Sequence, residues 1–148
     1  MTMKQLTLGF LIILSVAGCA TTGGRTTVPQ QAGATPWTNL DFNNAPETFR
    51  FAVVSDRNGG NRPGVFPDAL AKLNLVQPEF VMCIGDLIGG YTTDTEKLDG
   101  QWQEVDSELA VLEMPFFRVP GNHDITNFIM QEEWQKRYGQ PYYHFVYK

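Results

Sequence analysis

The sequence has few cysteines, few histidines and a shortage of positive charge. It contains two Cys and two His, and its 11 Lys and Arg are outnumbered by 16 Asp and Glu, for a net charge of −5. This balance argues against a nucleic-acid-binding surface, which needs clustered Lys and Arg. It leaves an anionic substrate open if metal ions supply positive charge. No glycine-rich phosphate loop with a lysine follows the first predicted strand, which disfavours a kinase-like or nucleotide-binding protein.

The chain begins with a targeting segment. Lys4 precedes an apolar run over residues 6–16, which is too short to span a bilayer comfortably. Small residues stand directly before Cys19, as in the bacterial lipobox, where the peptide is cut and the cysteine is lipidated. We therefore expect a lipoprotein signal peptide over residues 1–18 and a lipid-anchored protein of the bacterial cell envelope, exported from the cytoplasm. An ordinary signal peptide with a chance cysteine is the alternative.

Between the lipid anchor and the globular part lies a polar segment. Residues 19–47 are rich in Thr, Gly, Gln, Pro and Asn and have little apolar periodicity, which predicts a flexible tether. Trp37 and Leu40 within it are residues that could dock on the domain. After lipidation of Cys19, Cys83 is the sole thiol, so no intramolecular disulfide can form. Cys83 lies in an apolar run and is interpreted as a small buried hydrophobe.

Strands and helices alternate from residue 48 onwards. Four short apolar runs predict strands over residues 49–55, 80–84, 115–119 and 142–147. Apolar residues at steps of three and four predict helices that begin near residues 66, 93 and 125. This βαβαβαβ order predicts an α/β fold with a mostly parallel sheet and helices on both faces.

Two of these helices carry more detailed predictions. In the second, Thr93 and Glu96 have capping-box spacing. The apolar stripe that follows, which we expect to be buried, consists of Leu98, Trp102, Val105, Leu109 and Leu112. In the third, over residues 125–138, we expect the inward side chains to be those of Phe128, Ile129 and Trp134.

A polar turn follows each of the first three strands. These turns carry Asp56, Asp86 and the run Asn122-His123-Asp124. Because parallel strands end at the same edge of a sheet, we expect the three turns to converge. Carboxylates, an amide oxygen and an imidazole suit Mn²⁺, Fe, Zn²⁺ or Mg²⁺. A metal pair would offset the repulsion between the carboxylates and activate water for a displacement at phosphorus.

Taken together, these turns resemble the first three sequence blocks of the calcineurin-like metallophosphoesterases. The matching runs are Ser55-Asp56-Arg57-Asn58, Gly85-Asp86 and Gly121-Asn122-His123-Asp124. Members of that family have a β-sandwich flanked by helices and a two-metal centre that hydrolyses phosphomonoesters or phosphodiesters. The resemblance covers residues 49–148, roughly the amino-terminal half of such a domain. It implies two divalent metal ions as cofactors and a phosphate-ester small molecule as substrate.

The resemblance also implies a role for each of these residues. Asp56 would bind the first metal, and Asp86 would bridge both. Asn122 would bind the second metal through its amide oxygen. His123 would stabilise the transition state or protonate the leaving oxygen, and Asp124 would orient His123.

Two positions in the first block need separate interpretations. Asn58 stands where most members of the family have the histidine of an Asp-x-His motif. An amide could coordinate the first metal weakly, or a water could fill the position. Arg57 is expected to face the substrate phosphate, since Arg suits bidentate phosphate contact. A solvated loop arginine is the alternative.

The later histidines of the family pattern are also missing from this chain. The family closes its site with a further His and a Gly-His-x-His block, whereas the only other histidine here is His144, which we interpret as a strand residue. The chain stops inside the fourth predicted strand. We therefore expect residues 48–148 to be the front part of a longer domain and this 148-residue form to be inactive. An inactive lipoprotein that binds metal or phosphate is the alternative.

Overall fold

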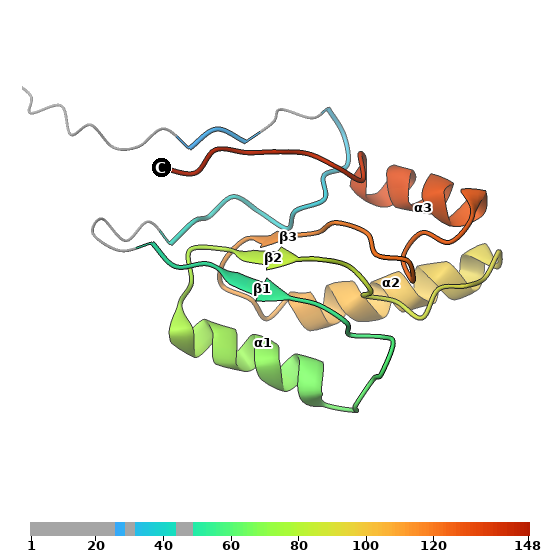
Figure 1. Cartoon of the computed structure of the whole chain (residues 1–148), viewed down its shortest axis with the longest axis horizontal. Coiled ribbons are helices and arrows are strands. Elements are labelled where there is room, and N and C mark those ends of the chain that lie inside the picture. Colours follow the sequence, from blue (N-terminus) through green and yellow to red (C-terminus); the bar gives the residue numbers. More distant parts are fainter. Residues whose placement is uncertain (1–25, 29–31, 44–48) are drawn as a thin grey trace, which may run out of the picture.

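The computed structural model describes residues 26–28, 32–43 and 49–148, so the signal peptide and Cys19 lie outside the described residues. Three parallel strands form one sheet in the order β1 (Ala52–Val54), β2 (Val81–Cys83) and β3 (Phe116–Phe117). The strands alternate with the helices α1 (Val65–Val76), α2 (Thr95–Leu109) and α3 (Phe128–Tyr138), as Figure 1 shows. The predicted α/β order with a parallel sheet is confirmed for these six elements. No helix in the described ranges is long and apolar enough to cross a membrane.

The amino-terminal end of α2 is capped by a different residue from the one predicted. Asp94 is the N-cap, and its Oδ1 accepts hydrogen bonds from the amides of Glu96, at 3.0 Å, and Lys97, at 3.1 Å. The capping box of Thr93 and Glu96 is not formed, because the carboxylate of Asp94 reaches these first-turn amides itself. The predicted stripe is confirmed for the residues within the helix: Leu98, Trp102, Val105 and Leu109 are buried.

Helix α3 begins three residues later than predicted. Asn127 is its N-cap and accepts a hydrogen bond from the amide of Met130 at 3.1 Å. The predicted burial of Trp134 is confirmed, whereas Phe128 is 83% exposed and Ile129 is 37% exposed, so their predicted burial is wrong. The other buried side chains are Met130 and Tyr138, which lie four residues on either side of Trp134 on one helix face.

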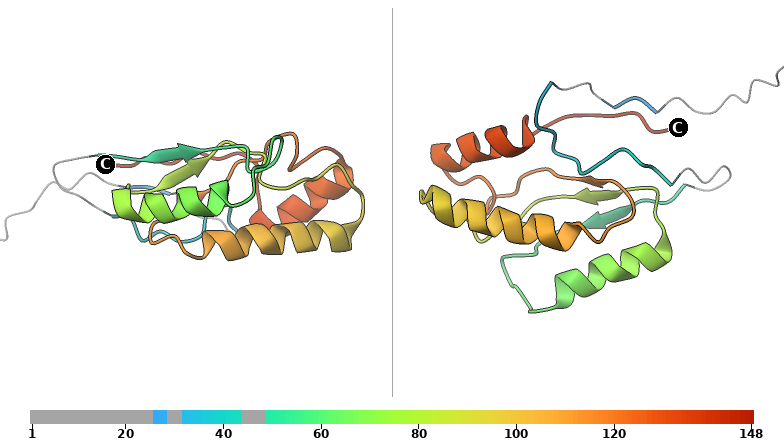
Figure 2. Two further views of the ribbon diagram at one scale, coloured as in Figure 1. Left: turned by 90° about the horizontal axis from the view of Figure 1, so that it is seen from below. Right: turned by 180° about the vertical axis from the view of Figure 1, so that it is seen from behind.

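All three helices pack on one face of the sheet, and the prediction of helices on both faces is wrong. The core on this face joins Val81, Cys83 and Phe116 of the sheet to Leu70 of α1, Trp102 of α2 and Trp134 of α3. The left view of Figure 2 shows the helices together on one side of the strands. Burial raises the pKa of the Cys83 thiol to about 12, so it stays protonated at neutral pH, as expected of a core residue.

Residues 35–43, part of the expected tether, lie along the outer edge of β3. Trp37 forms an antiparallel bridge with Phe117 and is 8% exposed. The amide of Arg118 donates to the carbonyl of Pro36 at 2.7 Å, which extends the sheet by a short stretch of backbone. The structure therefore differs from a flexible tether here, because Trp37 and Phe42 pack against the aromatic residues Phe80 and Phe117 of the domain. Leu40 is 45% exposed and does not dock.

The predicted fourth strand does not join the three-stranded sheet in the described structure. Residues 142–147 instead run across the face that the helices leave open, and they touch the amino-terminal segment through an antiparallel bridge between Thr27 and Val146. Phe145 stacks on Phe117 with ring centroids 4.6 Å apart, and the Tyr143 hydroxyl donates to the carbonyl of Arg118 at 2.9 Å. Aromatic contacts therefore hold this segment in place of a β ladder. His144 is exposed.

Candidate functional site

The turns after the three strands meet at the carboxyl edge of the sheet, as predicted. The amide of Asn58 donates to the carbonyl of Asp86 at 2.9 Å, which joins the first turn to the second. The amide of His123 donates to Oδ1 of Asp86 at 2.9 Å, which joins the third turn to the second. Asp86 is therefore the residue that connects all three turns, through its backbone carbonyl to the first turn and through its carboxylate to the third. The structure brings together the residues that the sequence placed at this edge.

Two glycines allow the second and third turns to approach so closely. A Cβ on Gly85, whose φ is +106°, would lie 2.4 Å from the backbone nitrogen of Gly121. A Cβ on Gly121 would lie 2.2 Å from Oδ1 of Asp86. Neither position has room for a side chain. Asp86 and Asp56 have φ values of 60° and 52° without being glycine, a conformation that costs roughly 1–3 kcal/mol and often marks functional turns.

Asp124 ties the third turn to the second through its buried carboxylate. Its Oδ1 accepts the amides of Leu87 at 2.9 Å and Ile88 at 3.1 Å. Its Oδ2 accepts the amides of Asp86 at 2.7 Å and Gly121 at 2.9 Å. The side chain is 1% exposed, and burial raises the pKa of its carboxyl, while the four amides act in the opposite direction. Asp124 thus positions backbone and does not touch the imidazole, contrary to the predicted role.

The orientation of His123 is set by a backbone carbonyl. Nδ1 of the imidazole lies 3.1 Å from the carbonyl oxygen of Gly89, and because a carbonyl only accepts, Nδ1 carries the proton in this contact. Tyr91 packs against the ring edge to face, with centroids 4.8 Å apart. A Cβ on Gly59 would lie 3.7 Å from Nε2, so this nitrogen faces the glycine loop of the first turn. Nε2 accepts no hydrogen bond from any described residue.

The two asparagines of the site are held by their amide nitrogens. Nδ2 of Asn58 donates to the carbonyl of Leu87 at 2.8 Å, and Nδ2 of Asn122 donates to the hydroxyl of Tyr91 at 2.7 Å. Each side-chain carbonyl oxygen is left without a donor in the described part of the chain. An amide can bind a metal ion only through its oxygen. The side-chain oxygens of Asn58 and Asn122 therefore have no partner among the described residues, and their binding of metal ions stays a prediction.

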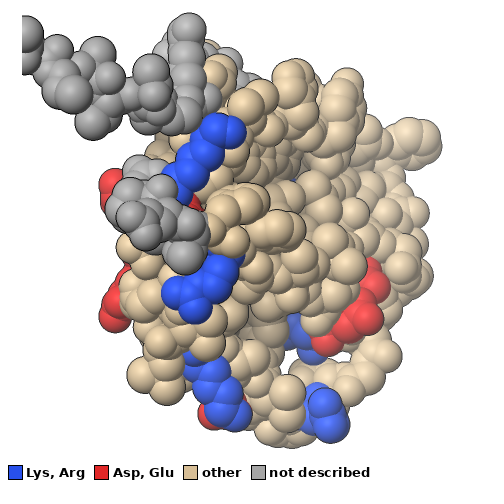
Figure 3. All heavy atoms as spheres, turned by 60° about the vertical axis from the view of Figure 1, so that its left-hand side comes forward, with Lys and Arg blue, Asp and Glu red and all other residues tan. Residues whose placement is uncertain are grey.

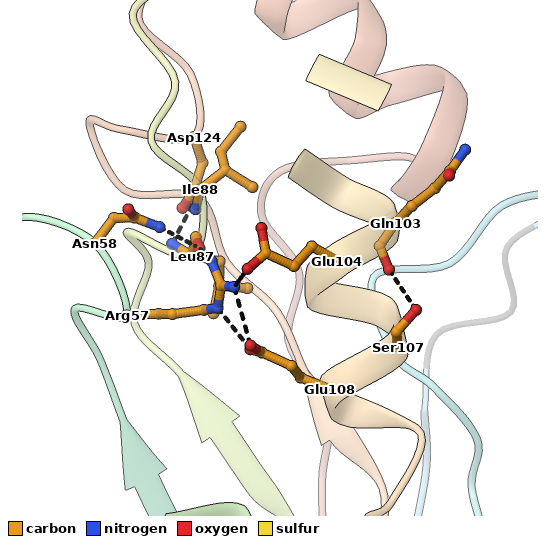
Figure 4. A network of polar contacts seen from close by, with 9 residues as sticks. All are labelled: Arg57, Asn58, Leu87, Ile88, Gln103, Glu104, Ser107, Glu108 and Asp124. Carbon is orange, nitrogen blue, oxygen red and sulfur yellow. Dashed lines mark hydrogen bonds and ion pairs between the residues drawn. The ribbon is translucent and has the colours of Figure 1, made fainter. Parts of the chain in front are cut away.

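Arg57 is buried in ion pairs with α2 and does not face a substrate phosphate, contrary to the prediction. Its Nε lies 2.6 Å from Oε2 of Glu108, and its Nη2 lies 2.6 Å from Oε1 of Glu104 (Figure 4). Its Nη1 donates to the carbonyl of Leu87 at 3.2 Å. The hydrogen bond with Glu108 raises the pKa of the guanidinium, which is 8% exposed. Arg57 therefore fastens the first turn to α2 and to the second turn.

Sequence reasoning missed the two glutamates that hold Arg57. Glu104 and Glu108 lie four residues apart on α2, so both carboxylates reach the same side of the helix. That spacing was the only indication in the sequence that the two carboxylates could bind one cationic side chain. It could not be linked to Arg57, because the pairing joins residues about fifty positions apart that only the packing of α2 against the first turn brings together.

Residues 49–148 match the sequence pattern of the calcineurin-like phosphoesterases. The chain belongs to the calcineurin-like phosphoesterase family. No curated protein and no solved structure matches the chain. The matched region contains all three turns of the site and every helix and strand described above. Family membership supports a metal-dependent phosphoesterase function in general terms.

The donors in this calcineurin-like phosphoesterase are mainly oxygen atoms. In addition to the two asparagine oxygens, Asp86 and Asp56 each have an Oδ2 that accepts no hydrogen bond from the described residues, whereas Oδ1 of Asp56 accepts from Ser55 at 3.1 Å. Oxygen donors of this kind fit a hard divalent cation such as Mg²⁺ or Mn²⁺. Within the described ranges, no group of three or more His, Cys, Asp and Glu side chains could hold a metal ion.

Basic side chains of the protein are spread out on the face that Figure 3 shows. Lys and Arg side chains lie apart from one another there, with uncharged atoms between them. This face offers no continuous basic patch among the described residues. The wider expectation, that the protein has no nucleic-acid-binding surface, stays a prediction.

Proposed function

We propose that this protein hydrolyses phosphomonoesters or phosphodiesters with a water molecule activated by two divalent metal ions. The observation that carries the proposal is the connection of the three turns through Asp86, whose Oδ1 accepts the amide of His123 at 2.9 Å. In this proposal Asp86 would hold both ions, Asp56 would hold the first and Asn122 would hold the second. Asn58 would be a weak additional ligand of the first ion. The bound ions would supply the activated water and offset the negative charge of the phosphate.

His123 is the proposed general acid. The carbonyl of Gly89 accepts a hydrogen bond from the Nδ1 proton, so Nε2 is the nitrogen that can exchange a proton with the substrate. In the imidazolium form, Nε2 donates a proton to the leaving oxygen of the ester, and it returns to the neutral form as the alcohol departs. Tyr91 restricts rotation of the ring because it packs against it edge to face. The hydroxyl of Tyr91 is bonded to Asn122, not to the imidazole. The identity of the metal is left open among Mn, Fe, Zn and Mg.

The second candidate is a lipoprotein that binds metal or phosphate without turning over an ester. The scarcity of ligands in the described residues favours it, because a two-metal centre needs more donors than two carboxylates and two amides. On either candidate, we expect the 148-residue chain to bind divalent ions weakly.

Hydrolysis of chromogenic esters separates the two candidates. The purified chain is assayed with p-nitrophenyl phosphate and bis(p-nitrophenyl) phosphate, with and without added Mn²⁺. If the chain is an enzyme, His123→Ala should lower kcat by a factor of roughly 10²–10⁴ and leave bound Mn²⁺ unchanged. His144→Ala is the matched control and should behave as the wild type, since His144 is exposed on the segment over residues 142–147. Bound Mn²⁺ without turnover would favour the second candidate.

The membrane anchor is a separate proposal, which rests on the sequence before Cys19. We propose that the mature protein begins at Cys19 and is held in the cell envelope by its lipid, since a cysteine that carries more than one acyl chain anchors stably. Cys19→Ser should move the protein out of the membrane fraction or leave it unprocessed. Cys83→Ala removes the other cysteine and should leave the distribution unchanged. An unaltered membrane fraction for Cys19→Ser would contradict the anchor.

A further inference from the structure

A cavity of about 240 Å³ opens beside Asp56, between the turn after β1 and the first turn of α1. One part of its wall is polar and includes Ser55, Asp56 and Arg62. The other part is apolar and consists of Val54, Val65, Phe66 and Ala69. A cavity that joins a proposed metal ligand to an apolar surface can receive both ends of an ester.

Arg62 is the arginine of this loop that remains available to a ligand. Its guanidinium is exposed and has no hydrogen bond or ion pair with the described residues. Arg57, five residues earlier, is held by two glutamates and a carbonyl. The backbone at Arg62 is fixed, because its carbonyl accepts the amide of Val65 at 3.2 Å where α1 begins. The side chain therefore extends from a defined position at the rim of the cavity.

The loop that carries Arg62 also touches the proposed general acid. Gly59 lies against Nε2 of His123, and Gly60 lines the cavity with Arg62. The loop therefore touches both the proposed general acid and the cavity beside Asp56. Arginine suits such a position because its planar guanidinium can bind two oxygens of a phosphate group at once.

We infer that Arg62 binds the phosphate group of the substrate and that the wall of Val65 and Phe66 receives its ester group. The site would then prefer phosphate esters with an apolar ring over esters of small polar alcohols. This inference rests on the proposed function, because it assigns parts of the substrate to the same site. The inference assigns phosphate binding to Arg62, in addition to the proposed metal ions and in place of Arg57, whose guanidinium is held by the glutamates of α2.

Binding of phosphonates tests the inference without requiring turnover. Phenylphosphonate and methylphosphonate are titrated into the ¹⁵N-labelled full chain, in detergent and without added metal, and amide shifts are followed by NMR. Phenylphosphonate should shift the amides of Gly60, Arg62 and Phe66 and should bind more tightly than methylphosphonate. Arg62→Gln should weaken binding of both by about tenfold or more. Val65→Thr, which replaces a methyl by a hydroxyl at similar volume, should reduce the preference for the phenyl group.

Arg50→Gln is the matched control, because Arg50 is exposed and precedes β1, at the opposite end of the strand. It should leave both affinities unchanged. Equal affinities for wild type and Arg62→Gln, shifts confined to other regions, or no binding to the wild type would each overturn the inference. The proposed function is judged separately, by hydrolysis with Mn²⁺. Loss of phosphonate binding in Arg62→Gln would therefore support a phosphate-binding role of Arg62 even if the chain does not hydrolyse esters.

Discussion

Replacing Asp124 with asparagine is expected to lower the free energy of unfolding by about 3–5 kcal/mol, since it leaves two buried backbone amides without an acceptor. Each carboxylate oxygen of Asp124 accepts two backbone amides, from Leu87 and Ile88 on one side and from Asp86 and Gly121 on the other. An asparagine can satisfy only one of these pairs. Its NH₂ group must face the other two N–H groups, so two donors lose their acceptor whichever way the amide is turned.

Chemical denaturation followed by the fluorescence of the buried Trp102 and Trp134 gives the measurement. Asp94→Asn is the matched control: Asp94 also accepts two amides, but with Oδ1 alone, so an asparagine can replace it with little loss. We expect that variant to change stability by less than about 0.5 kcal/mol. Similar stabilities for Asp124→Asn and Asp94→Asn would mean that the carboxylate of Asp124 does not hold the two turns together.

The convergence of the three turns was predictable because it follows from topology. Short apolar runs separated by amphipathic stretches indicate parallel strands with helical crossovers, and parallel strands end at one edge. No knowledge of side-chain contacts is needed for that step. The same reasoning placed Cys83 in the core, since it lies in a strand with apolar neighbours on both sides.

Roles that depend on distant partners could not be predicted from the sequence. Asp124 stands beside His123 in the chain, which suggested that it orients the imidazole, but its carboxylate points to amides of the preceding turn. The ring is oriented by the carbonyl of Gly89, and a carbonyl has no signature in the sequence because every residue has one. Arg57 was predicted to bind a phosphate because its actual partners, on α2, are remote in the sequence and could not be identified from it.

The position of the helices relative to the sheet also lay beyond the sequence pattern. Both faces of the sheet are apolar, which predicts that both are covered. The pattern does not indicate which elements cover each face. One face is covered by α1, α2 and α3. The other is covered by aromatic residues of two extended segments, which pack on Phe80 and Phe117 and include Trp37, Phe42, Tyr143 and Phe145. The first segment lay in the expected tether and the second was predicted as a fourth strand of the sheet. Nothing in the sequence therefore indicated that their aromatic side chains would pack across this face.

If the protein turns over phosphate esters, replacing Asp86 with asparagine should abolish most of the metal-dependent activity while the fold persists. The asparagine can keep its oxygen toward the amide of His123, which now bonds Oδ1 of Asp86 at 2.9 Å. Its NH₂ group then takes the place of Oδ2, so a negatively charged ligand becomes a neutral donor that repels cations. We expect kcat/KM to fall by about a thousandfold, which corresponds to about 4 kcal/mol, with the unfolding free energy changed far less.

Asn58→Ala provides the comparison that identifies Asp86 as the shared ligand. Asn58 offers one neutral oxygen to at most one ion, so its loss should lower kcat/KM by no more than about tenfold, or about 1.4 kcal/mol. The affinity for Mn²⁺, followed through the EPR signal of the free ion, should fall in the same order and gives a readout that does not depend on turnover. Equal losses for Asp86→Asn and Asn58→Ala, in affinity and in rate, would contradict a bridging role. The first turn would then contribute as much to the metal centre as the second, and the connection of the turns through Asp86 would be structural only.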